Sequence, residues 1–115
     1  MTTEEDEANR GETVRMRLTI GALRHWLKRQ NKWRHFKIEN GYHCPVATYL
    51  LATTGAYEVW VMVDYVSITF AGEAATQYDL PKPISNYVIN VDMGEGNSIR
   101  TDDALWVLEE EARHL

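Results

Sequence analysis

The single cysteine, Cys44, is the residue whose type is best suited to covalent chemistry. A thiolate is a nucleophile and a metal ligand, and it needs an adjacent base or a lowered pKa. His43 precedes Cys44, but neighbouring side chains diverge. Pro45 predicts that a helix begins directly after Cys44, and a helix N-terminus can lower the pKa of a thiol. Free cysteines are nevertheless mostly buried, so we interpret Cys44 as a small packed residue.

A metal site would require ligands at characteristic spacings, such as Cys-x-x-Cys or His-Glu-x-x-His. The candidate ligands are scattered and show neither pattern: His25, His35, His43 and Cys44. We therefore predict no metal site and no cofactor.

Adjacent carboxylates occur at Asp102-Asp103 and at Glu109-Glu110-Glu111. The first pair suits the positive N-terminal end of a helix, and the second group suits a solvated helix face. Gly94-Glu95-Gly96 lacks the third glycine and the strand–helix setting of a nucleotide-binding loop. We predict that the protein is not an enzyme.

Positive charge is concentrated in one segment, residues 15–37, which contains no aspartate or glutamate. Eight of the chain's 12 lysines and arginines fall in this segment, although the formal net charge of the whole chain is -5. Charge asymmetry of this size is an argument about binding partners rather than about the fold.

The basic segment interleaves its cations with aromatic side chains. Such mixtures bind phosphates and stack bases, and they are also typical of protein interfaces. The alternative is that Trp26 and Phe36 belong to the core and that the cations only coat a solvated helix. We predict a partner-binding surface for an acidic protein or a ribonucleoprotein complex, or alternatively for nucleic acid. Its predicted residues are Arg24, Lys28, Arg29, Lys32, Trp33 and Arg34.

A third interpretation is that the chain neutralises this surface itself. An acidic run, Glu4-Glu5-Asp6-Glu7, lies within the polar first segment of the sequence. The run could fold back onto the basic surface, or it could reach a second copy of the chain and form a homodimer.

The length of 115 residues fits one domain, and the composition, 44% hydrophobic and 25% charged, is that of a globular protein. We expect residues 1–12 to form a disordered acidic tail and residues 13–115 to form a single domain. The sequence shows no apolar run of the kind found in signal peptides or membrane spans. We therefore expect a cytoplasmic protein that makes no membrane contact.

Two helices are predicted in the first half of the chain. The first has Thr19 as its N-cap and an apolar face at Leu23, Trp26, Leu27 and Gln30. Residues 33–38 alternate apolar and basic side chains, which favours a short strand or an extended link, and Asn40-Gly41 predicts a turn. The second helix begins at Cys44-Pro45 and ends before Gly55.

A change to a two-residue period predicts a hairpin with strands at 58–63 and 66–70. The first strand is apolar on both faces, because Trp60 and Met62 alternate with valines. We therefore expect it to be a central strand, or a strand that a partner covers. A loop is predicted for residues 72–79.

Residues 84–92 fit a helix or a strand, and Pro83 favours the helix. A loop follows at 92–97. In the last helix Thr101 is the predicted N-cap, Asp102 and Asp103 suit the N-terminal dipole, and Arg113 and His114 suit the C-terminus. Its predicted buried stripe is Leu105, Leu108, Ala112 and Leu115. The predicted fold is α+β, with a small antiparallel sheet (the hairpin at about 58–70) packed by three or four helices.

Four short motifs carry a resemblance to a known group of proteins. They are Cys-Pro-Val-Ala-Thr-Tyr-Leu at 44–50, Leu-Pro at 80–81, Tyr-Val-Ile-Asn-Val-Asp at 87–92, and Ile-Arg-Thr-Asp-Asp-Ala-Leu-Trp-Val-Leu-Glu at 99–109. In this order they resemble small proteins encoded by phages and other mobile elements. The resemblance leaves out the basic segment and implies no site residues. It implies a setting in which such proteins bind host or defence machinery, as anti-CRISPR proteins do.

The predicted function is that of a non-enzymatic binding module, of phage or mobile-element origin, which inhibits or adapts a host protein or ribonucleoprotein complex. The alternative is a nucleic-acid-binding accessory protein that uses the basic 15–37 segment directly.

Overall fold

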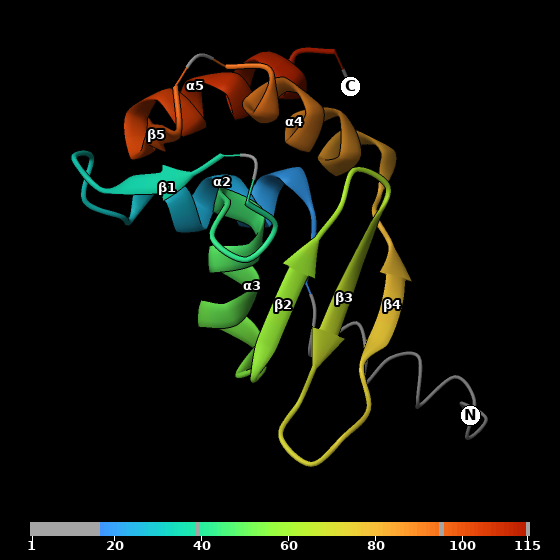
Figure 1. Cartoon of the computed structure of the whole chain (residues 1–115). Coiled ribbons are helices and arrows are strands. Elements are labelled where there is room, and N and C mark those ends of the chain that lie inside the picture. The colour runs from blue at the N-terminus through green and yellow to red at the C-terminus, as the bar shows by residue number, and fades with distance from the viewer. Residues whose placement is uncertain (1–16, 39, 95, 115) are drawn as a thin grey trace, which may run out of the picture.

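The structure is a computed structural model, and it describes residues 17–38, 40–94 and 96–114. These residues form an α+β fold, as predicted, in which α4 and α5 lie together at one end and a three-stranded sheet lies at the other (Figure 1). In chain order the elements are α2 (Ile20–Lys28), β1 (His35–Lys37), α3 (Pro45–Thr54), β2 (Glu58–Val61), β3 (Tyr65–Thr69), β4 (Thr76–Asp79), α4 (Lys82–Asp92), β5 (Ser98–Arg100) and α5 (Thr101–Ala112).

The strands form two separate antiparallel sheets. The larger has the order β2-β3-β4, and the smaller pairs β1 with β5. The hairpin prediction is confirmed, with Val61 opposite Val66 in the register. The prediction of a central position for the first hairpin strand is wrong, because β2 is at an edge and β3 is central. Val59 and Val61 of β2 face the core, while Trp60 lies on the outer face.

One predicted loop contains a strand, and a second is followed directly by a strand that was not predicted. Residues 76–79, in the predicted loop 72–79, form β4, which pairs with β3 from Tyr65↔Asp79 to Ile68↔Thr76. Residues 98–100 form β5, directly after the predicted loop at 92–97. Both strands are short; β4 is mostly exposed, and two of the three residues of β5 are half-buried. Neither strand has the apolar alternation by which a strand is recognised in sequence.

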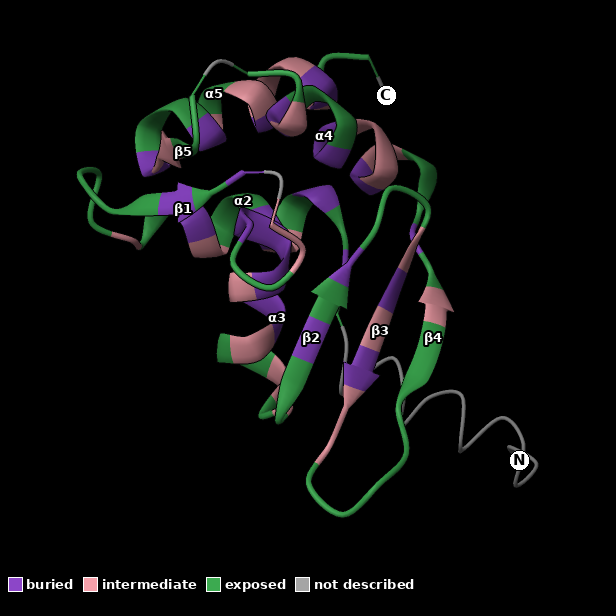
Figure 2. Cartoon of the chain, in the orientation of Figure 1, coloured by how far each residue is buried: buried purple, intermediate pink, exposed green. Residues whose placement is uncertain are grey.

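One continuous core lies between the helices and the inner face of the larger sheet (Figure 2). Helix α3 packs on β2, and α5 packs against both α2 and α4. The largest fully buried side chains come from every helix and from both hairpin strands: Leu23, Leu27, Val46, Leu50, Val59, Val66, Ile68, Ile84, Tyr87 and Leu108.

Local sequence signals fix the ends of α2 and α3. The Thr19 side chain accepts a hydrogen bond from the Ala22 backbone N–H at 3.0 Å, as expected of an N-cap. Pro45 occupies the first turn of α3, and Gly55 ends it with a left-handed φ of 74°. That conformation is unfavourable for residues with a Cβ atom, so glycine suits the position.

Helix α4 confirms the helical prediction for residues 84–92. Tyr87 is fully buried, and its hydroxyl donates a hydrogen bond to the Ala104 carbonyl at 3.0 Å. This bond joins α4 to α5 inside the core and satisfies a polar group that would be costly to bury alone.

The predicted cap of the last helix is wrong. Arg100 is the N-cap residue of α5, and Thr101 is the first helical residue. The backbone N–H and the hydroxyl of Thr101 both donate to the Arg34 carbonyl, at 2.9 and 3.1 Å. A buried threonine therefore ties the start of α5 to the segment before β1 instead of capping the helix.

The apolar stripe of α5 is correct in part. Leu108 is fully buried, Leu105 and Ala112 are partly buried and pack against the core, and Leu115 lies outside the described residues. The predicted tail, 1–12, also lies outside them. None of the helices in the described ranges has the length and apolar character needed to cross a membrane.

Candidate functional site

The six predicted partner-binding residues are all exposed, but they do not form one face: Arg24 and Lys28 lie in α2, Arg29 is its C-cap, and the other three follow the helix. Arg24 points toward α5, where its Nε lies 2.7 Å from the Glu109 carboxylate. Lys28, one turn later, lies on the same side of the helix as Arg24. Arg29 instead lines a groove on the side facing α3. The structure thus divides the predicted surface.

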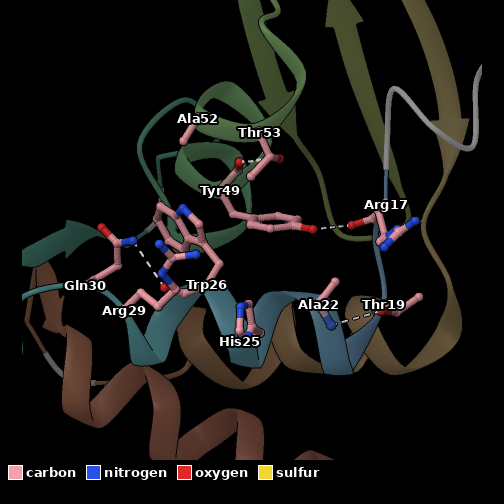
Figure 3. Close-up of a pocket in the computed structure, with 10 residues that line it drawn as sticks. All are labelled: Arg17, Thr19, Ala22, His25, Trp26, Arg29, Gln30, Tyr49, Ala52 and Thr53. Atoms are coloured by element: carbon pink, nitrogen blue, oxygen red, sulfur yellow. Dashed lines mark hydrogen bonds between the residues drawn. The ribbon is translucent and has the colours of Figure 1, made fainter.

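The groove lies between α2 and α3 and has a volume of about 830 Å³ (Figure 3). Residues from the start of the described chain, from one face of α2 and from α3 line it: Arg17, Thr19, Ala22, His25, Trp26, Arg29, Gln30, Tyr49, Ala52 and Thr53. It is an open groove rather than an enclosed cavity, so an extended ligand could enter without any rearrangement of the fold.

Two aromatic rings, one half-buried and one buried, are among the lining residues of the groove. Trp26 of α2 and Tyr49 of α3 meet edge to face, with ring centroids 5.6 Å apart. The Tyr49 hydroxyl donates a hydrogen bond to the backbone carbonyl of Arg17, which fixes the chain at the rim of the groove (Figure 3). Burial raises the pKa of Tyr49, so its hydroxyl stays protonated as a donor at neutral pH.

The charge of the groove has one sign. Arg17 and Arg29 contribute two guanidinium groups, and His25 contributes an imidazole. No aspartate or glutamate is among the described residues that line it. Guanidinium groups bind carboxylates and phosphates with two parallel hydrogen bonds, so the arrangement is suited to an anionic ligand that also has a surface to place against the half-buried Trp26 ring.

Arg34 extends the basic surface beyond one end of the groove. Its Nη1 donates to Oε1 of Gln30 at 2.7 Å, and Gln30 also lines the groove. The Arg34 guanidinium lies over the rings of Trp26 and Phe36, at 5.7 and 5.1 Å from their centroids. These contacts hold the guanidinium in place, since cation–π stacking and a hydrogen bond act together. Phe36 is a core residue, as the alternative interpretation expected, whereas Trp26 is half-buried and only packs against the core.

Trp33 forms a second aromatic feature, outside the groove. Its side chain is 62% exposed, and it lies between two cations. The Lys32 ammonium is 5.3 Å and the Arg100 guanidinium 5.1 Å from the ring centroid. Arg100 is also paired with Asp102 at 2.9 Å, which offsets part of the positive charge at this position.

Cys44 does not have the features of a nucleophile. The residue is only 6% exposed, and burial raises the pKa of its thiol from 9.0 to about 11. The thiol is therefore protonated at neutral pH, and the possibility of a pKa lowered by the helix N-terminus is wrong. In the described part of the chain, no three His, Cys, Asp or Glu side chains come together in a way that could hold a metal ion.

The outer face of β2 is a different, largely apolar surface. Trp60 and Met62 are each 37% exposed there. Tyr42 stacks on Trp60 at a centroid distance of 6.1 Å, and a pocket of about 310 Å³ lies beside this pair. Within the described residues, the turn at Gly41 and Tyr42 covers part of this face and leaves Trp60 and Met62 partly exposed.

Several groove residues were not predicted from the sequence. No pattern linked Tyr49, Ala52 and Thr53 to the basic segment, because α3 reads as an apolar core helix. A partial signal did exist in α2, where Ala22, Trp26 and Arg29 recur at helical spacing and so share one face.

With the fold and the groove described, the class of molecule is a small α+β domain that carries an open cationic groove. Comparison with protein-family models, with curated proteins and with solved structures finds no match to this chain.

Proposed function

We propose that this protein is a non-enzymatic binding module that holds an acidic segment of a protein partner in the groove between α2 and α3. The observation that carries the proposal is the lining itself, in which Arg17 and Arg29 flank two aromatic rings and no carboxylate is present among the described residues. Arginine and aromatic side chains dominate the energetics of protein interfaces, and charge complementarity gives specificity.

The biological setting that we propose follows the resemblance to phage and mobile-element proteins. In this setting the module acts in the cytoplasm, and it inhibits or adapts a host protein or ribonucleoprotein complex. The groove supports an inhibitor or adaptor role because it offers binding groups, while the buried, protonated Cys44 offers no reactive thiol.

A binding titration tests the groove directly. A fluorescein-labelled decaglutamate peptide is titrated with the full chain, and affinity is read from fluorescence anisotropy. Arg29→Glu should weaken binding by at least about tenfold, because attraction is replaced by repulsion inside the groove.

The matched control is Lys82→Glu. Lys82 is an exposed residue of α4 that does not line the groove, and its reversal changes the net charge by the same amount. It should alter the affinity by no more than about twofold, since an exposed charge away from the site is screened by salt. Equal losses in the two variants would mean that the peptide senses only the overall charge, and would refute the groove as the site.

A second candidate function, binding of single-stranded nucleic acid, is favoured by Trp33. An exposed indole between Lys32 and Arg100 suits base stacking beside phosphate contacts. Titration with oligothymidylate distinguishes this function. Trp33→Ala should weaken oligonucleotide binding while leaving peptide binding unchanged, and log affinity should fall with log salt at a slope of about -0.7 per phosphate.

A further inference from the structure

The described chain begins at the groove. Arg17 is its first residue and lines the groove, and its carbonyl accepts the hydrogen bond from Tyr49. Leu18 is buried, and Thr19 caps α2. The direction of the chain is thus fixed at the rim of the groove, so the sixteen preceding residues are all tethered there.

The tethered residues have the charge that the groove lacks. They include four consecutive acidic residues, Glu4-Glu5-Asp6-Glu7. The last of these, Glu7, lies ten positions before Arg17. Ten residues can span up to about 33–36 Å when extended. Helix α2 has nine residues and is therefore only about 13 Å long. The acidic run can consequently reach any part of the groove, including the end at Arg29.

We propose that the acidic run at residues 4–7 binds the groove of its own chain and competes there with the partner. This inference rests on the proposed function, because both ligands are acidic segments that use Arg17 and Arg29. Tethering at this distance gives an effective concentration on the order of millimolar. A contact that is too weak to form between separate molecules is therefore strong enough to occupy the groove within one chain.

The consequence is a groove whose apparent affinity is tuned by the chain itself. A partner must displace the acidic run, so its observed affinity is reduced by the fraction of molecules in which the groove is free. Neutralising the run should therefore tighten partner binding by about two- to tenfold.

Paramagnetic relaxation in the full chain tests the contact without any partner. A nitroxide is attached at Ala8→Cys in a Cys44→Ala background, next to the acidic run. The readouts are the indole N–H of Trp26 and the side-chain amide of Gln30, both of which line the groove. We expect both signals to broaden at low salt and to recover at about 1 M salt, where the screening length is about 3 Å.

The matched control is the same labelled chain with Glu4→Gln, Glu5→Gln, Asp6→Asn and Glu7→Gln, which keeps the shapes of the side chains and removes their charge. The broadening should disappear in this variant. Equal broadening in both chains, or none in either, would overturn the proposal.

A mixture of nitroxide-labelled chains with isotope-labelled, nitroxide-free chains separates the two geometries. Broadening in the mixture would place the run on a second copy and overturn the intramolecular contact. None of these outcomes requires partner binding, so the decaglutamate titration still decides the proposed function independently.

Discussion

Replacing Gly41 by alanine should loosen the turn that covers the edge of the larger sheet. A Cβ atom at this position would lie 2.4 Å from Cδ1 of Trp60 and 2.6 Å from the carbonyl oxygen of Val61. The Trp60 ring is partly exposed and can rotate away. The Val61 carbonyl belongs to the backbone of β2 and cannot, so the turn itself must move outward.

Two interactions are lost when the turn moves. The Val61 N–H donates to the Gly41 carbonyl at 2.9 Å, and Tyr42 stacks on Trp60 at 6.1 Å. A backbone hydrogen bond contributes about 0.5–1.5 kcal/mol and an aromatic pair a similar amount. Together they predict a destabilisation of about 2 kcal/mol, which for a domain of this size lowers the Tm by about 8 °C.

Thermal melts followed by circular dichroism measure this shift, and urea titrations show whether the midpoint moves at constant slope. Gly21→Ala is the matched control, since a Cβ atom at Gly21 in α2 meets nothing within 4 Å. That variant should be more stable by about 0.5–1 kcal/mol, because alanine is the better helix former. A Gly41→Ala protein that melts at or above the parent temperature would refute the reasoning about the turn.

Three other experiments probe the core and the charges. Leu108→Ala should lower the free energy of unfolding, measured by chemical denaturation, by about 2–5 kcal/mol. Leu105→Ala should lower it clearly less, because only Leu108 is fully buried. Equal losses in the two variants would contradict the observed orientation of α5. The pKa of Cys44 is raised from 9.0 to about 11, so its contribution to stability is complete below about pH 9 and is lost as the pH rises toward 11. The free energy of unfolding from urea titrations should therefore fall over that interval by more in the parent than in Cys44→Ala, the difference being on the order of 2–3 kcal/mol. The side chains of the ion pair Arg24–Glu109 are 44% and 30% exposed. A double-mutant cycle on this pair should therefore give an interaction free energy of no more than about 1 kcal/mol. A larger value would mean that the packing of α5 depends on this ion pair.

The helices were predictable because their signals are local. Thr19 before α2, Pro45 and Gly55 around α3, and the prolines before α4 each act within a few residues of the helix end. The hairpin was predictable for the same reason, since β2 and β3 are neighbours in the chain and β3 alternates apolar and polar residues.

The remaining features depend on contacts between distant parts of the chain. Strand β4 is polar and is recognisable only through its pairing with β3, while the role of Thr101 depends on the Arg34 carbonyl 67 residues away. The candidate site was predictable only in composition. The basic segment was evident, but its division between α5 and the groove follows from how α2 packs, which no local pattern records.

The pairing of β1 with β5 and of α2 with α5 has a consequence for synthesis. Ribosomes make α2 and β1 early, but the elements that cover them are the last two in the fold. Until α5 has been made, the side of α2 that packs on it is open to solvent and β1 has no strand beside it. The lining of the groove, by contrast, falls entirely within residues 17–53. A nascent chain therefore carries every lining residue of its groove before it carries the helix that completes the core, and in that interval the acidic run would be the nearest ligand available to cover those residues.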